Sequence, residues 1–85
     1  MEKFHAELQA TVSALFRRYP ELYGFTVQDF EGRLVLAHVG VDPFVGEGVS
    51  ERVRGEVAET LLEFIDERPE ALELLRDRTF ARVLH

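Results

Sequence analysis

Residues 23–41 read YGFTVQDFEGRLVLAHVGV, and the structure that this stretch forms determines how the rest of the chain must pack. The runs on either side of Glu31-Gly32 are rich in β-branched and aromatic residues, which suit a pleated, half-buried surface. Gly32 enters a left-handed turn conformation without steric cost. The stretch therefore predicts a β-hairpin. Because a lone hairpin is marginal in water, the flanking segments or another chain must cover it.

The register of this hairpin stays open at the level of sequence. A two-residue turn places Leu34 and Leu36 on the same face as Val27, whereas a three-residue loop with a glycine bulge places Val35 and Ala37 there. In both registers the second strand begins with four consecutive apolar residues. Such a strand is most stable when both of its faces are covered.

Residues 2–19 carry the pattern of an amphipathic helix. Its apolar residues recur at steps of three and four and form one stripe: Phe4, Leu8, Val12, Leu15, Phe16 and Tyr19. Arg17 and Arg18 suit the negative end of the helix dipole, and Pro20 disfavours the helical conformation for the residue before it. We therefore expect this helix to end near residue 19.

A second helix is expected from Ser50, which can serve as its N-cap, to about Glu67. The Pro and Gly content of residues 42–49 marks the preceding segment as a loop. The apolar arc of the helix takes up nearly half of its circumference and holds Val53, Val57, Ala58, Leu61, Leu62, Phe64 and Ile65. This arc is wider than that of an ordinary surface helix, so we expect the helix to touch two apolar surfaces.

The opposite side of the second helix carries an acidic ridge, defined as Glu56, Glu59, Glu63, Asp66 and Glu67. Spacings of three and four place these like charges side by side, at a cost of about a few tenths of a kcal/mol per pair. Residues 47–73 contain nine acidic residues and three arginines, so their net charge of −6 equals that of the whole chain. The ridge either serves solubility, which we favour, or binds a basic protein partner.

A third helix is expected from Pro69 to the C-terminus, with Leu72, Leu75, Thr79 and Val83 on its apolar stripe. The alternative makes residues 79–84, TFARVL, a third strand, because half of them are β-formers. The sequence thus predicts an α+β fold in the order helix–β-hairpin–helix–helix. Its small antiparallel sheet packs against helices and can be completed by dimerisation.

Composition limits the classes of function. Eighty-five residues with 46% hydrophobic content are expected to form one small α+β domain over residues 1–85. A net charge of −6 disfavours nucleic acid and anionic membranes as partners, and no apolar run approaches the length of a membrane span. The absence of cysteine and of an apolar signal sequence at the start leads us to expect a cytoplasmic protein.

Few residues suggest chemistry. His38 can lie near Asp29 in one register, and the loop Gly46-Glu47-Gly48 precedes a helix N-terminus, where backbone amides can hold an anion. A ligand-binding or enzymatic module built on this loop and His38 is therefore the alternative function. Acidic neighbours oppose an anion at the loop, and no nucleophile or metal-binding motif is present. We expect no catalytic constellation, cofactor or metal.

The preferred hypothesis is an acidic module that acts through protein–protein contact as a homodimer. Its candidate interface residues are Leu34, Leu36, Phe44, Val45, Glu56, Glu59 and Glu63. Phe44 stands in a loop, where an aromatic ring gains stability only by finding apolar surface. It either folds back as a plug over the open end of the sheet, which we favour, or anchors a second subunit.

Overall fold

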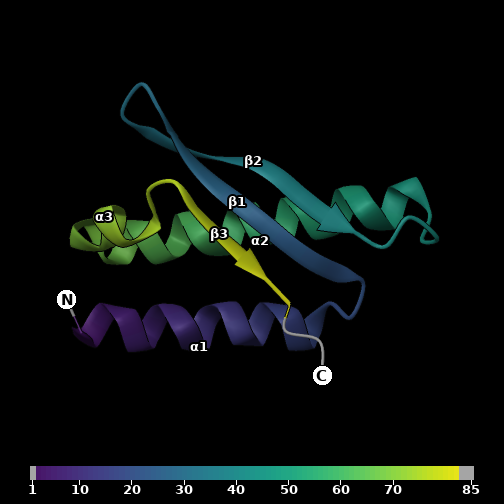
Figure 1. The fold of residues 1–85 in the computed structure, drawn as a ribbon, viewed down its shortest axis with the longest axis horizontal. Helices are drawn as coiled ribbons and strands as arrows, with labels where there is room; N and C mark the ends of the chain where they lie inside the picture. The colour runs from purple at the N-terminus through teal and green to yellow at the C-terminus, as the bar shows by residue number, and fades with distance from the viewer. Residues whose placement is uncertain (1, 83–85) are drawn as a thin grey trace.

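The computed structural model describes residues 2–82 and shows a three-stranded antiparallel sheet packed against helices (Figure 1). The elements in chain order are α1 (Glu2–Arg18), β1 (Leu22–Phe30), β2 (Arg33–Val41), α2 (Glu47–Glu67), a 3-10 turn η1 (Pro69–Ala71), α3 (Leu72–Leu75) and β3 (Arg78–Ala81). The predicted α+β class and the order helix–hairpin–helix–helix are confirmed. A third strand follows the last helix and joins the sheet.

The hairpin adopts the two-residue turn. Phe30 pairs with Arg33, and the intervening Glu31 and Gly32 both have positive φ angles, 53° and 81°. Two left-handed residues in succession define a turn whose twist matches that of the flanking strands. The amide of Gly32 also donates a hydrogen bond to Oδ1 of Asp29 at 3.1 Å. Of the two registers that the sequence left open, this is the one that places the two leucines of β2 toward the helices.

A β-bulge at Ala37 modifies this register. Thr26 pairs with His38, but the next residue, Val27, pairs with Leu36, so Ala37 has no direct partner on β1. The extra residue shifts the side-chain alternation by one position. The side chains of β2 that pack against the core are therefore Leu34 and Leu36 before the bulge and Val39 and Val41 after it.

The core lies between the sheet and the helices. In Figure 1, α2 runs behind the strands and α1 lies beside the sheet, along the β3 edge. Phe25 of β1 is 2% exposed at the centre of this core. The centroid of its ring lies 6.0 Å from that of Phe16 and 5.1 Å from that of Phe80. The aromatic contacts join α1, β1 and β3, so the C-terminal strand belongs to the core of the subunit.

The prediction that the last helix continues toward the C-terminus is wrong within the described residues. α3 ends at Leu75, Asp77 adopts a left-handed conformation with φ 56°, and β3 begins at Arg78. Phe80 is only 8% exposed, because it pairs with Phe25 of β1. This burial of apolar surface stabilises the strand, and a helix that contacts only its own neighbours in sequence would not provide it. Close approach of the strands is possible at Gly24, where a Cβ atom would lie 2.8 Å from the carbonyl oxygen of Phe80. Residues 83 and 84 of the alternative strand lie outside the described residues.

Arg82 fastens the end of β3 to the end of α1. Its Nε donates to the carbonyl oxygen of Leu22 at 2.9 Å, and Nη2 donates to the carbonyl oxygens of Phe16 at 2.6 Å and Tyr19 at 2.9 Å. The last carbonyl groups of a helix lack partners within the helix, and a cation at this end also interacts favourably with the helix dipole. One guanidinium thus satisfies three backbone acceptors.

The N-cap predicted for the second helix is wrong. α2 begins at Glu47 with Gly46 as its N-cap, and no side chain caps it. The amides of Val49 and Ser50 both donate to the carbonyl oxygen of Gly46 at 3.1 Å, so Ser50 lies inside the first turns. An acidic residue at the first helical position suits the positive end of the helix dipole, which favours the earlier start.

Candidate interaction surface

α2 carries two apolar stripes with different surroundings. The first is fully packed in the core, with exposed fractions of 0–6%, and consists of Val53, Val57, Leu61 and Phe64. The second, composed of Ala58, Leu62 and Ile65, is only partly buried, and Leu62 is 59% exposed. The wide arc seen in the sequence therefore has two parts. Only the first part is covered by other segments of the chain.

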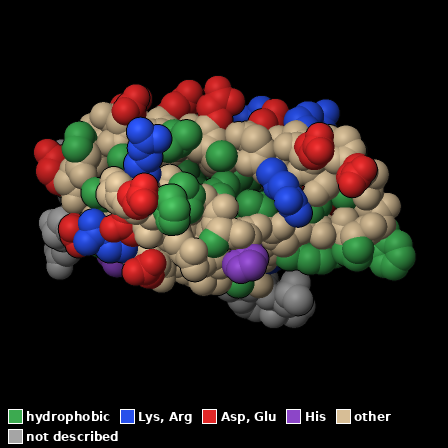
Figure 2. Space-filling model, turned by 90° about the horizontal axis from the view of Figure 1, so that it is seen from above, with side chains coloured by type: hydrophobic (Ala, Val, Ile, Leu, Met, Phe, Trp, Pro, Cys, Tyr) green, Lys and Arg blue, Asp and Glu red, His purple; other side chains and the backbone are tan. Residues whose placement is uncertain are grey.

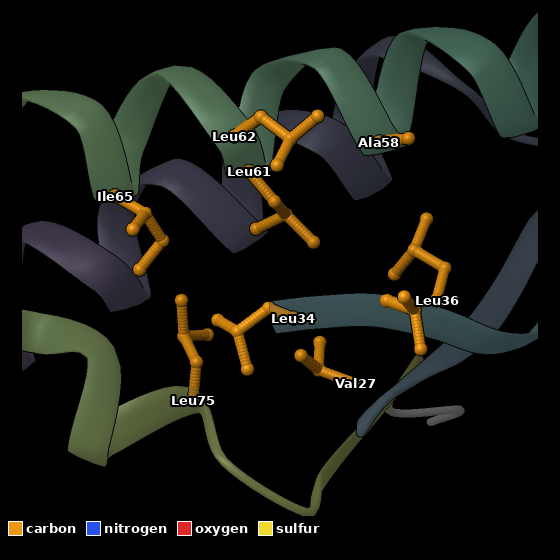
Figure 3. Close-up of a pocket in the computed structure, with 9 residues that line it drawn as sticks. Val27, Leu34, Leu36, Ala58, Leu61, Leu62, Ile65 and Leu75 are labelled. Carbon is orange, nitrogen blue, oxygen red and sulfur yellow. The ribbon is translucent and has the colours of Figure 1, made fainter. Parts of the chain in front are cut away.

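The second stripe of α2 and the strand β2 enclose an apolar groove of about 240 Å³. All nine residues that line it are apolar, and they come from β1, β2, α2 and α3. Leu61 and Ile65 point from α2 into this groove, toward Leu34 of β2 and Leu75 of α3 (Figure 3). Figure 2 shows green side chains gathered in a hollow that a row of acidic side chains borders. We call this feature the β2–α2 groove.

The rim of the β2–α2 groove is the free edge of the sheet. Among residues 2–82, β2 pairs with β1 alone, so the N–H and C=O groups of its other edge have no strand partner there. None of its nine residues is buried, and Val35 is 42% exposed. After Arg33 the strand contains no proline, lysine or acidic residue, so its protection against edge pairing is limited to the β-bulge at Ala37. The edge is therefore open to another strand.

The acidic ridge is not uniform. The hydroxyl of Tyr19, a buried residue directly after α1, donates a hydrogen bond to Oε2 of Glu56. Glu56 is therefore half-buried and joins α2 to α1, whereas Glu59 and Glu63 are exposed. Neither of the latter forms an ion pair with another residue in the described part of the chain, so of the predicted interface acids these two remain available to a partner.

Phe44 is 95% exposed, so the prediction that it plugs the sheet is wrong. Its loop is held by Asp42, whose Oδ1 accepts the amide of Phe44 at 2.9 Å and whose carbonyl oxygen accepts the amide of Val45 at 3.2 Å. Such a turn satisfies the loop backbone locally and needs no anchoring ring. Val45 is half-buried, and the ring of Phe44 faces solvent.

The outer face of the sheet, which α2 does not cover, is mixed in character (Figure 1). Thr26 and Thr79 form a hydroxyl–hydroxyl hydrogen bond of 3.1 Å across β1 and β3. Tyr23 is 49% exposed, and its pKa is raised by partial loss of hydration and by the nearby Asp42 carboxylate. The face thus carries scattered apolar residues among polar ones, as a solvated face of an antiparallel sheet does.

The residues of the alternative site receive no support. His38 is exposed on β2, and no hydrogen bond joins its side chain to another described residue. Gly46 and Gly48 lie exposed at the start of α2, beside the acidic Glu47. Within residues 2–82 no group of three or more His, Asp or Glu side chains could hold a metal ion.

Leu34 and Leu36, predicted as interface residues, do line the groove, but three other lining residues were not among the predicted interface residues. Val35, Leu62 and Ile65 supply much of the exposed apolar surface here. The width of the apolar arc of α2 was the signal that pointed to the last two.

Comparisons with protein-family models, with curated proteins and with solved structures found no match. None of the helices in the described part of the chain is long and apolar enough to cross a membrane.

Proposed function

We propose that the protein acts through protein–protein contact, as a homodimeric interaction module. The observation that carries this proposal is the β2–α2 groove, an apolar surface that the subunit itself leaves uncovered. Water contact with Leu62, Ile65 and Val35 is unfavourable, and burial of apolar surface is the main driving force for association. The proposal needs no cofactor. The cysteine-free composition suits the reducing cytoplasm in which we place the protein.

A basic protein partner is a second hypothesis, motivated by the exposed carboxylates of Glu59 and Glu63 beside the groove. Surface charges of this kind steer association more than they set affinity. We therefore assign the main contact to the groove and treat the acidic ridge as a border that keeps the surface hydrated.

Static light scattering after size exclusion tests the proposal at micromolar concentration. We expect a mass twice the 9.8 kDa of one chain. Leu62→Glu should shift the protein to the monomer mass, because a carboxylate in the contact would be desolvated. Leu62 is 59% exposed in the subunit, so the charge should leave the fold intact by circular dichroism.

Ala14→Glu, an equally charged change at an exposed position of α1, provides the control and should keep the dimer mass. A wild-type protein that elutes and scatters as a monomer across this concentration range would overturn the proposal.

A further inference from the structure

The free edge of β2 is self-complementary. Leu34-Val35-Leu36 reads the same in both directions, so an antiparallel copy centred on Val35 places each leucine opposite the other leucine of the second chain. In a two-fold interface the same patch of both subunits is in contact, and leucine opposite leucine makes this patch complementary to itself. The free strand edge, the β2–α2 groove and the half-buried Leu34 and Leu36 thus lie together.

We propose that two copies of the chain pair antiparallel through β2, centred on Val35, and continue the sheet from three strands to six. The inference rests on the proposed function and specifies its geometry. A two-fold axis normal to the sheet keeps the helices of both copies on one side. The leucines of β2 in the second copy then lie beside Leu62 and Ile65 of the first and close the β2–α2 groove.

The accessible surface area of one chain is consistent with a second copy bound at this edge. Its accessible area is 5841 Å², whereas the scaling for monomeric proteins gives about 5,200 Å² for a chain of 9.8 kDa. The excess is close in size to the roughly 800 Å² that each partner buries in a standard interface. The radius of gyration of 12.7 Å also exceeds the value of about 12 Å expected at this length. Covering one edge and its groove would bring the area per subunit to the usual range.

The other edge of the sheet does not offer the same surface. β3 has four residues, and the hollow beside it is shared with α1 and contains Gln9, Ser13 and two arginines. Unpaired apolar surface and unprotected backbone coincide only along β2 within the described residues. This favours pairing through β2 over pairing through β3.

Single-cysteine variants test the geometry without interference, because the chain contains no cysteine. Directly opposite residues of an antiparallel pair have Cβ atoms about 4.5–5.5 Å apart, near the separation found in disulfides. Val35→Cys should therefore form a covalent dimer on mild oxidation at micromolar concentration. Val35 is exposed in the subunit, so the change should leave the circular dichroism spectrum unchanged.

Gln28→Cys is the matched control. Gln28 is exposed and pairs with Val35 within the hairpin, so it lies on the same face but one strand further from the axis. Its counterpart in the second copy would be three strand spacings away, roughly 14 Å, which no disulfide spans. We expect Val35→Cys to cross-link at least tenfold faster than Gln28→Cys.

Thr79→Cys on β3 reports on the opposite edge, where Thr79 is exposed. A dimer by light scattering in which Thr79→Cys cross-links fastest, or in which Val35→Cys and Gln28→Cys react equally, would overturn the proposed pairing and leave the proposed function intact. A monomer by light scattering with no rapid cross-linking of Val35→Cys would overturn both.

Discussion

The two edges of the sheet differ in almost every respect. β3 is four residues long, buries Phe80 and is followed by Arg82, which binds three backbone carbonyls. β2 is nine residues long, buries no side chain fully and leaves its outer backbone edge without a strand. The shorter strand is thus the better integrated of the two, although strand length alone would suggest the reverse.

The comparison shows that neighbouring elements decide how an edge is protected. α1 lies along β3, so the C-terminal strand has apolar and polar neighbours on α1 (Figure 1). β2 has the second stripe of α2 beside it, and the two leave the β2–α2 groove between them. An unprotected edge exposes backbone N–H and C=O groups with which another strand can pair.

The largest expected effect concerns the aromatic contact of β3. Phe80→Ala removes a ring that is 8% exposed and packed against Phe25, so the free energy of unfolding should fall by about 3–5 kcal/mol. Phe30→Ala makes the same change at the hairpin tip, where the ring is 63% exposed, and should cost less than about 1 kcal/mol. Urea denaturation measures both. Equal losses would mean that β3 is no better integrated than the tip of the hairpin.

The next effect concerns the charged end of β3. Arg82→Met keeps the apolar stem but removes the guanidinium donor from three carbonyl oxygens, of which that of Tyr19 still accepts the amide of Leu22, so stability should fall by about 2 kcal/mol. Arg33→Met, at the start of β2, is the matched change, because Arg33 is exposed and forms no ion pair with another described residue. We expect it to leave the urea midpoint unchanged. A stable Arg82→Met protein would show that the three hydrogen bonds contribute nothing net.

A smaller effect is expected beside the groove, on the acidic ridge. Glu59→Gln combined with Glu63→Gln removes a like-charge pair at a spacing of four and should stabilise the subunit by a few tenths of a kcal/mol. Glu56→Gln on the same helix weakens the acceptor of the Tyr19 hydroxyl and should destabilise it by about 1 kcal/mol. Pull-downs at low salt test the second hypothesis. We expect the double variant to retain the same bound proteins, and their loss would assign the ridge to a basic partner.

The smallest effect is expected in the loop between β2 and α2. Phe44→Ala removes a ring that is 95% exposed, so the free energy of unfolding should stay within about 0.5 kcal/mol of the wild-type value. Thermal melting at several protein concentrations measures this. A loss near 3 kcal/mol at every concentration would restore the plug hypothesis. A dimer dissociation constant raised tenfold with unchanged subunit stability would extend the contact surface to this loop.

Local patterns in the sequence were enough to predict the hairpin, the two long helices and the wide apolar arc of α2. β-branched and aromatic residues mark the strands, steps of three and four mark the helices, and Gly32 marks the turn, so each can be recognised without knowledge of its neighbours. The end of α1 was predicted to within one residue, because Pro20 acts on the residue before it.

Only the tertiary structure decided which of these surfaces remain uncovered. Whether Leu62 or Leu61 is buried depends on the rotation of α2 against the sheet, and both belong to the same apolar arc in the sequence. The strand after α3 likewise forms because Phe80 meets Phe25, which is fifty-five positions earlier in the chain. Burial is a property of contacts between distant segments, and local propensity, which is worth less than about 1 kcal/mol per residue, yields to it.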